Sequence, residues 1–128
     1  MTKKIIHTKA APEPIGPYSQ AVQFDKLLFT SGQIAMNPQT NELLLGNVEE
    51  QTRQVLENLK AVLEAANSSL DDVLKTTIFI KNMDDFLKIN EVYNSFFENS
   101  VPARSTVEVS RLPKDVLVEI DCIAFAGS

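Results

Sequence analysis

The feature that most constrains this chain is a helical pattern that begins at Asn47 and has a single apolar side. Asn47 with Glu50 three residues later is the arrangement of a capping box, in which each side chain accepts a hydrogen bond from the backbone of the other residue. From Val48 to Ala66 the apolar residues recur every three or four positions, the spacing of one side of an α-helix. Because a helix with one apolar side buries that side, we expect it to cover one face of a sheet.

The remaining segments predict strands and a second helix. Residues 20–24 and 27–30 predict a hairpin, although its two-residue turn lacks the usual glycine. The second helix is expected to follow a cap at Asn82. Further strands are predicted at residues 73–81, 105–110 and 116–126, with one more near the N-terminus. Because helices fall between strands only in the second half, we predict an α+β fold in which two helices cover one face of a mixed six-stranded sheet.

Length and composition indicate one domain that spans residues 1–128. The chain is 44% hydrophobic and 23% charged, which is ordinary for a globular protein. No apolar run approaches the about 20 residues of a membrane span, and the N-terminal residues lack the apolar centre of a secretory signal. We therefore expect a cytoplasmic protein without a membrane partner. If the sheet face without helices is also apolar, a second copy of the chain is the simplest partner to cover it.

The sparse histidine and cysteine content excludes several kinds of site. Cys122 and His7 are the only residues of their types, so one chain can form neither a disulfide nor a zinc site of the usual histidine and cysteine kind. Nucleophilic triads that need a histidine would depend on His7, which we interpret as an ordinary strand or surface residue. The net charge of −5 repels a phosphate backbone, so nucleic acid is a disfavoured partner.

The C-terminal segment PARSTVEVSRLPKDVLVEID places charged residues in strands that otherwise have the pattern of a core. Because alternate residues of a strand share a face, Arg104 lies with Thr106, and Glu119 lies with Asp121. One interpretation is a cross-strand ion pair on a solvated face, which the periodicity alone favours. The other is a site in which Arg104 binds a substrate carboxylate while Glu119 orients and deprotonates a water molecule. Cys122 has the opposite parity to Glu119, so we expect a buried, inert thiol.

Five other residues are candidates only in combination with that site. The Tyr18 ring could cover a pocket, although core packing is the simpler interpretation. The backbone of Ser31, Gly32 and Gln33 could present N–H groups to an anion, or could simply end a strand. Asn90 lies on the polar side of the second helix, where a solvated position is the ordinary interpretation.

Four ordered blocks, IGPYSQ, TSGQI, KTTIFI and PARSTVEVSRLPKDVLVEI, together resemble the RidA family, also called YjgF, the reactive-intermediate deaminases. The resemblance covers nearly the whole chain. It implies a chorismate-mutase-like α+β fold and a homotrimer whose sheets form a central barrel, with ligand clefts between subunits. It also implies hydrolysis of 2-imino or enamine acids to 2-keto acids and ammonia, with no metal or organic cofactor.

The resemblance further implies a role for each candidate residue. Arg104 matches the arginine that binds the substrate carboxylate, and Glu119 matches the acid that places the attacking water. Tyr18 matches the cleft tyrosine, and Ser31 and Gly32 match the loop whose backbone lines the cleft. Asn90 matches a polar helix residue near the cleft.

Thr106 departs from the family pattern, because many members carry cysteine two residues after the arginine. A threonine hydroxyl can still bond substrate or water, so we expect activity to survive and thiol-dependent behaviour at this position to be absent. Two other functions stay open, namely a module that senses a keto or imino acid without turnover and an RNA-cleaving translation inhibitor. The acidic balance and the lack of a basic patch interleaved with aromatic residues weigh against RNA.

Overall fold

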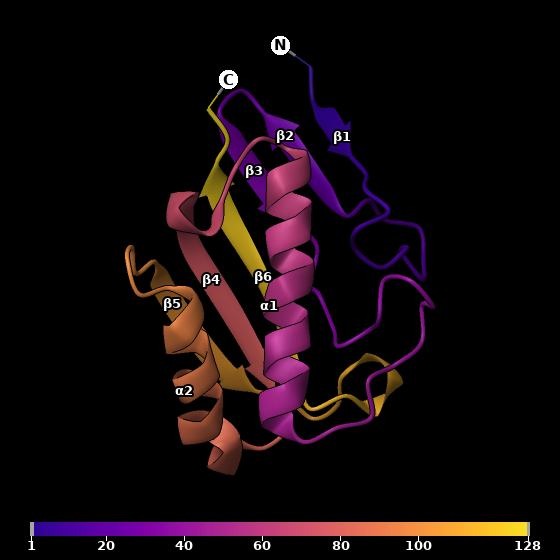
Figure 1. Cartoon of the computed structure of the whole chain (residues 1–128), viewed down its shortest axis with the longest axis vertical. Helices are drawn as coiled ribbons and strands as arrows, with labels where there is room; N and C mark the ends of the chain where they lie inside the picture. The colour runs from indigo at the N-terminus through magenta and orange to yellow at the C-terminus, as the bar shows by residue number, and fades with distance from the viewer. Residues whose placement is uncertain (1, 128) are drawn as a thin grey trace.

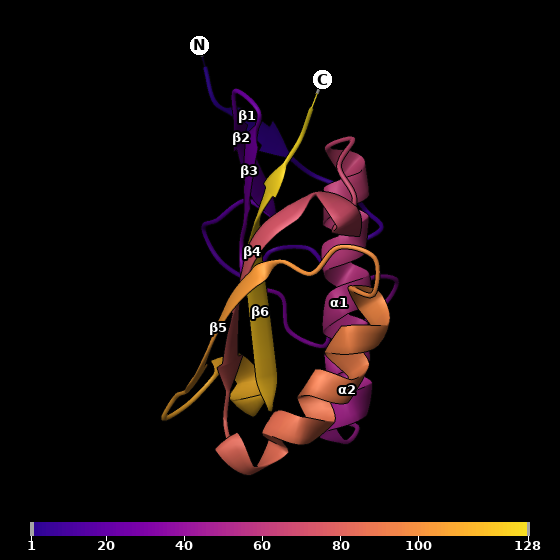
Figure 2. The ribbon, with the colours of Figure 1, turned by 90° about the vertical axis from the view of Figure 1, so that its left-hand side faces the viewer.

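Both helices lie on the same side of one six-stranded sheet (Figure 1). The computed structural model describes residues 2–127. The strands are β1 (Lys4–Ile6), β2 (Ala21–Phe24), β3 (Leu27–Thr30), β4 (Val73–Ile80), β5 (Ala103–Glu108) and β6 (Val118–Phe125). The helices are α1 (Val48–Ala65) and α2 (Phe86–Phe96), and the short 3-10 turns are η1 (Leu70–Asp72), η2 (Met83–Asp85) and η3 (Pro113–Asp115). Figure 2 shows the sheet edge-on beside a separate layer of helices, so the predicted α+β fold is confirmed.

The sheet is mixed, with the strand order β1-β2-β3-β6-β4-β5. β4 and β5 pair in parallel and are connected through α2, whereas every other pair of neighbours is antiparallel. The last strand of the sequence, β6, therefore lies in the middle of the sheet, between β3 and β4. As a result, β4 separates every residue of β6 from β5.

The helix α1 begins as the sequence predicts, with a capping box. The Asn47 side chain accepts a hydrogen bond of 2.9 Å from the Glu50 N–H, and the Glu50 carboxylate accepts one of 3.3 Å from the Asn47 N–H. The apolar side of α1 and the inner sheet face form one core. Burial of apolar surface there stabilises the folded state by about 25 cal/mol per Å². Its fully buried side chains include Val55, Leu56, Leu63, Leu28, Ile78, Val118 and Ile120. Neither helix in the described part of the chain is long and apolar enough to cross a membrane.

The second helix starts later than predicted, whereas the hairpin turn is as predicted. Asn82 accepts a hydrogen bond from the Asp84 N–H and so caps the 3-10 turn η2, after which α2 begins at Phe86. The β2–β3 hairpin has the expected two-residue turn. Asp25 takes the left-handed conformation there, with φ 55°, which Asp tolerates better than most residues.

The strands β5 and β6 have shifted ends. β5 spans Ala103–Glu108 rather than 105–110, because it pairs in parallel with residues 75–80 of β4. β6 spans Val118–Phe125 rather than 116–126, because η3 turns the chain just before it. The shifts leave the alternation of side chains within each strand unchanged.

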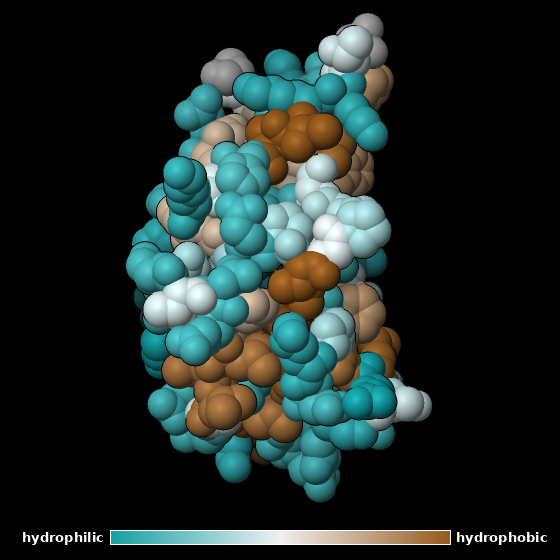
Figure 3. All heavy atoms as spheres, turned by 90° about the vertical axis from the view of Figure 1, so that its right-hand side faces the viewer, coloured by the Kyte–Doolittle hydropathy of each residue, from teal (hydrophilic) through white to brown (hydrophobic). Residues whose placement is uncertain are grey.

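The sheet face away from the helices is apolar over β2, β3 and β6. Its residues alternate with inner-face residues such as Leu28 and Ala124, which have no exposed surface. Four side chains of this outer face are 42–48% exposed, namely Phe24, Leu27, Phe29 and Phe125. A neighbouring side of the molecule, seen in Figure 3, instead shows separate hydrophobic patches on a mostly hydrophilic surface. The outer face therefore has the apolar character that the sequence analysis linked to a partner, while the trimer itself stays a prediction.

Candidate functional site

Arg104 lies on the helix-facing side of β5, against α2. Phe86, Asn90 and Tyr93 are spaced four and three residues apart, which places them on one side of α2. The Arg104 Nη1 atom donates a hydrogen bond of 2.8 Å to Asn90 Oδ1. Its Cζ atom lies 5.4 Å from the centre of the Phe86 ring and 5.0 Å from that of Tyr93, within cation–π distance. We call these four residues the arginine half of the site.

No carboxylate neutralises Arg104 among residues 2–127, because neither ion pair found there includes it. The Tyr93 hydroxyl bonds Thr76 at 2.7 Å, and burial raises the pKa of Tyr93, so the phenol stays neutral. In front of the guanidinium is a pocket of about 280 Å³, whose wall also includes Asn94, Val101 and Pro102. A guanidinium held by one amide oxygen and two rings keeps N–H donors for a planar anion such as a carboxylate.

Glu119 and Asp121 lie on the other face of the sheet, where no helix packs. Both line a pocket of about 330 Å³. The rest of its wall comes from the loop before β2, the end of β3 and η3, and comprises Ile15, Tyr18, Thr30, Ser31, Gly32 and Pro113. Burial, and then the charge of Asp121, raise the pKa of Glu119 above the ordinary glutamate value. We call the residues of this pocket the glutamate half, and its acid is suited to exchange protons closer to neutral pH.

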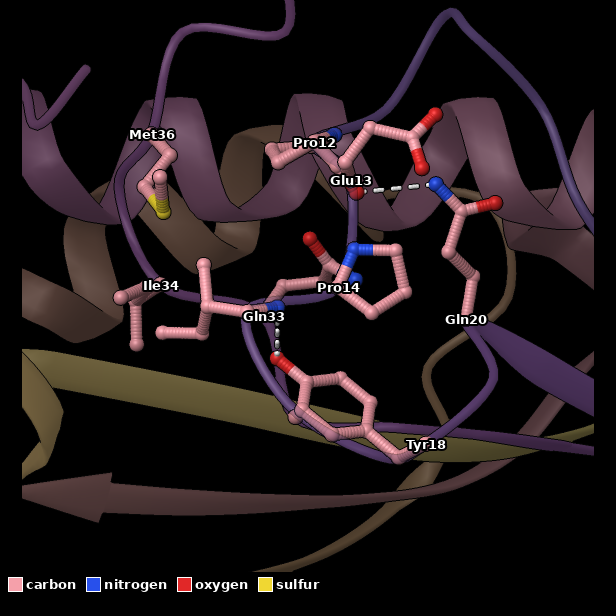
Figure 4. A pocket seen from close by; sticks show the side chains of 10 residues that line it. Pro12, Glu13, Pro14, Tyr18, Gln20, Gln33, Ile34 and Met36 are labelled. Carbon is pink, nitrogen blue, oxygen red and sulfur yellow. Dashed lines mark hydrogen bonds between the residues drawn. The ribbon is translucent and has the colours of Figure 1, made fainter. Parts of the chain in front are cut away.

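The loop that carries Tyr18 is anchored by Gln20, as Figure 4 shows. Gln20 is 1% exposed, and its side chain bonds backbone atoms of residues 8–12 at 2.7–3.3 Å. The Tyr18 hydroxyl accepts a hydrogen bond of 3.2 Å from the Ile15 N–H, which holds the ring against the loop. The cavity drawn in Figure 4 measures about 20 Å³ and has room for about one water. It belongs to the packing of the loop, so the larger pocket is the candidate ligand site.

Only one of the three backbone N–H groups considered for anion binding is available. The N–H groups of Ser31 and Gln33 donate to backbone carbonyls at 2.9 Å. The Ser31 hydroxyl is also committed, since it donates to the Ser19 carbonyl at 2.6 Å. Within the described residues, the Gly32 N–H has no hydrogen-bond partner. Ser31 therefore shapes the loop, while Gly32 keeps a donor for a ligand.

The cross-strand pair predicted between Arg104 and Glu119 or Asp121 is wrong within one chain. Arg104 is opposite Thr76 of β4, and Glu119 is opposite Phe79. Residues three apart in a strand point to opposite faces, so β4 separates the two side chains and the sheet lies between them. Parity within each strand was correct, but it does not determine how two strands are placed relative to each other.

The predicted site residues fall into two groups and one exception. Arg104 lies with Asn90, whose side-chain oxygen accepts a hydrogen bond from the guanidinium, so Asn90 is more than a solvated residue. The glutamate half contains the predicted residues Tyr18, Ser31, Gly32 and Glu119. Thr106 shares the inner face with Arg104, but its hydroxyl oxygen is buried and has no hydrogen-bond partner among the described residues. Substrate binding by Thr106 stays a prediction.

Two features of the site are missing from the sequence-based interpretation. The apolar pattern of the second helix assigns Phe86 and Tyr93 to the core, yet both rings flank the Arg104 guanidinium. Their spacing of four and three residues from Asn90 was the signal in the sequence that they share its side of the helix. Asp121 had no assigned role but lines the pocket of the predicted acid.

The buried, inert thiol of Cys122 is confirmed, because burial raises its pKa to about 11. No group of three acidic, histidine or cysteine residues within residues 2–127 could hold a metal ion.

Comparisons with known proteins agree with one another. The family model described as Endoribonuclease L-PSP matches residues 8–126. A RutC family protein of Pyrococcus horikoshii is 58% identical over 123 residues, which cover 96% of this chain and 98% of the relative. The 2-iminobutanoate/2-iminopropanoate deaminase of Dermatophagoides farinae is 50% identical over 121 residues, which cover 94% of each chain. The crystal structure of E. coli TdcF with bound serine has a TM-score of 0.91 at 50% identity, and the match covers 95% of this chain and 98% of that one.

Gly32→Ala is expected to displace the Glu119 carboxylate and to lower the free energy of unfolding by at most about 1 kcal/mol, because the end of a flexible side chain can change rotamer. The added Cβ would collide with Glu119 Oε2 and lie 2.8 Å from its Cδ. Gly16→Ala is the matched control, because its Cβ would meet only the Tyr18 ring, at 3.3 Å. Urea denaturation of both variants and a crystal structure of the first give the answer. A Glu119 carboxylate that keeps its position in Gly32→Ala would contradict the close approach of Gly32 to this side chain.

Thr106→Val is expected to keep the free energy of unfolding or raise it by up to about 1 kcal/mol, because a buried hydroxyl without a partner is replaced by a methyl group. The matched control is Thr76→Val, which removes the partner of the buried Tyr93 hydroxyl and is expected to cost about 1–3 kcal/mol. Chemical denaturation measures both. If the two variants lost equal stability, the Thr106 hydroxyl would have a partner, such as a water molecule or a second copy of the chain.

Proposed function

Because this chain belongs to the RidA (YjgF) family, we propose that it hydrolyses 2-imino acids and their enamine tautomers to 2-keto acids and ammonia. The substrates are 2-iminobutanoate and 2-iminopropanoate, the tautomer of 2-aminoacrylate, and a relative with 50% identity carries the name of this activity. The reaction uses no metal or organic cofactor. In this proposal the chain works as a single domain in the cytoplasm, where it removes reactive intermediates of amino acid metabolism.

The observation that carries the proposal is the unneutralised guanidinium of Arg104. It lies between two aromatic rings, bonds one amide oxygen and faces a pocket of about 280 Å³. A 2-imino acid offers the planar carboxylate that such a group binds through two parallel hydrogen bonds. The bound serine named for the E. coli relative is also an α-substituted carboxylic acid, which supports a ligand of this class.

The proposed reaction needs one carboxylate that takes a proton from water and later returns it to the substrate. A water oxygen attacks C2 of the protonated imine, the C=N electron pair moves to nitrogen, and the Glu119 carboxylate takes a proton from the water. Glu119 then returns this proton to the amine nitrogen. The C–N bond breaks as the hydroxyl oxygen forms the C=O bond, and the hydroxyl proton leaves with ammonia as ammonium. Thus iminium acid and water give keto acid and ammonium, with Glu119 regenerated.

Both halves can act on one substrate only if they come from different copies of the chain. Arg104 and Glu119 lie on opposite faces of one sheet, so a single chain cannot place both beside the same small molecule. We infer that the outer face of one copy meets the β5 and α2 edge of the next. A homotrimer with a central barrel of sheets provides this geometry three times and also covers the exposed Phe24, Leu27, Phe29 and Phe125.

Two alternative functions are separated by direct measurements. The family model is described as an endoribonuclease, but the net charge of −5 works against binding to RNA. Salt-dependent RNA binding with cleavage would favour that alternative. A sensing module would bind 2-ketobutyrate without accelerating any hydrolysis.

Arg104→Ala is expected to lower kcat/KM for 2-iminobutanoate by at least about 100-fold, because the substrate carboxylate loses its only charged partner. The substrate is generated in the assay by threonine dehydratase. Arg104→Lys keeps the charge but not the planar fork, so it should retain only part of the activity. The control is Arg53→Ala on α1, outside both halves, which should keep full activity. Wild-type activity in Arg104→Ala would sink the carboxylate assignment.

Co-expression of Arg104→Ala with Glu119→Gln is expected to restore activity that neither variant has alone. In a mixed cyclic trimer about a third of the clefts, one of the three, would combine an intact Arg104 with an intact Glu119 from the neighbouring copy. Two affinity tags isolate the mixed assemblies, and light scattering gives their mass. Mixed trimers without activity would show that the two residues do not share a cleft.

A further inference from the structure

Asp121 is a second carboxylate in the glutamate half that the proposed reaction does not use. It stands two residues from Glu119 on the same face of β6, and both line the pocket of about 330 Å³. Both side chains are only partly exposed. Within residues 2–127 neither carboxylate has a hydrogen bond or an ion pair with another side chain. Two like charges in a half-buried pocket without bonded partners affect each other's ionisation.

The surroundings treat the two carboxylates differently. Burial raises the pKa of Asp121, but the Lys75 ammonium on β4 opposes this. Lys75 is placed opposite Ile123, two residues beyond Asp121 on the same face of β6. Glu119 has no such cation, and the negative charge of Asp121 adds to the effect of burial in raising the pKa of Glu119. A cation thus favours the ionised form of Asp121, whereas burial and a like charge both favour the protonated form of Glu119.

Other titratable groups around the pocket do not change this difference between Asp121 and Glu119. β3 contributes none, and within the single chain the loop before β2 contributes only Tyr18 to the pocket wall. The charged groups around η3 lie outside that wall, and two of them pair with each other at 2.8 Å: Arg111 and Asp115, with Lys114 between them. Arg104 of a second copy would face the same cleft in the proposed assembly.

We propose that Asp121 is a positioning residue of this site: its carboxylate, which lines the same pocket as Glu119, enables Glu119 to accept a proton from water and return it to the leaving amine. This inference rests on the proposed imine hydrolysis. The same carboxyl has to act first as a base and then as an acid, so it works best when both forms are accessible at the working pH. Without Asp121, Glu119 would still accept a proton but would be a poorer donor to the amine.

Asp121→Asn tests the proposal directly, because it keeps the side-chain shape and removes one negative charge. The measurement is a titration of the Glu119 carboxyl carbon by NMR in 13C-glutamate-labelled protein, with the signal assigned through Glu119→Gln. The Glu119 midpoint is expected to move to lower pH by about one pH unit, because the repelling charge is gone. The acid limb of kcat/KM, which depends on ionised Glu119, should move to lower pH by the same amount.

The control and a second variant make the result specific. Asp71→Asn removes the same charge from the exposed turn η1 and should leave the midpoint unchanged. Lys75→Met should move the Glu119 midpoint to lower pH, because Asp121 is then less readily ionised and its charge repels the Glu119 carboxylate less. This variant serves if Asp121→Asn does not assemble. Arg104 is unchanged throughout, so its field is the same in every comparison.

An unchanged Glu119 midpoint in Asp121→Asn, or no fall of that midpoint in Lys75→Met, would overturn the proposal. A structural role for Asp121 would change stability or the height of the activity profile, but not its position along the pH axis. The titration needs no turnover, so it also separates this inference from the proposed function. If the chain hydrolyses no imine, the midpoint still reports whether Asp121 controls the ionisation of Glu119.

Discussion

The central position of β6 is the constraint on which the rest of the structure depends. Its inner residues, such as Ile120 and Cys122, are buried against α1 and close the core. Its outer residues, Glu119 and Asp121, are then held on a strand at the middle of the sheet, paired with β4 on one side, while the bridge between Gln33 and Ile120 holds the other side. The same alternation that stabilises the core therefore positions the acid of the candidate site.

The second constraint is the charge of Arg104. A half-buried guanidinium without a carboxylate costs free energy unless something else compensates it, and here two aromatic rings and one amide oxygen do so only in part. The remaining hydrogen-bonding capacity suits an anionic ligand. In the proposed function the acid that acts on this ligand lies across the sheet, so that function requires an assembly of copies, for which the apolar outer face offers a surface.

Much of the fold was predictable because it depends on local patterns. The capping box at Asn47, the apolar side of α1, the two-residue hairpin and the strand alternation all follow from residues close in sequence. The strand ends were less predictable, because β5 starts and stops where its neighbour β4 offers hydrogen bonds. Motifs suggested most of the candidate site residues but not Phe86 and Tyr93, since an aromatic residue on a helix has the same pattern whether it packs in a core or under a guanidinium.

The sequence by itself determined which residues share a face within each strand and helix, because side-chain periods of 2 and about 3.6 are properties of a single element. It also indicated the family, since each motif is a run of consecutive residues. Only the tertiary structure decided that Arg104 and Glu119 lie on opposite faces and that Asp121 shares the pocket of Glu119. The physical reason is that the placement of β4 between β5 and β6 is set by long-range strand pairing, and no local period of the sequence contains that information.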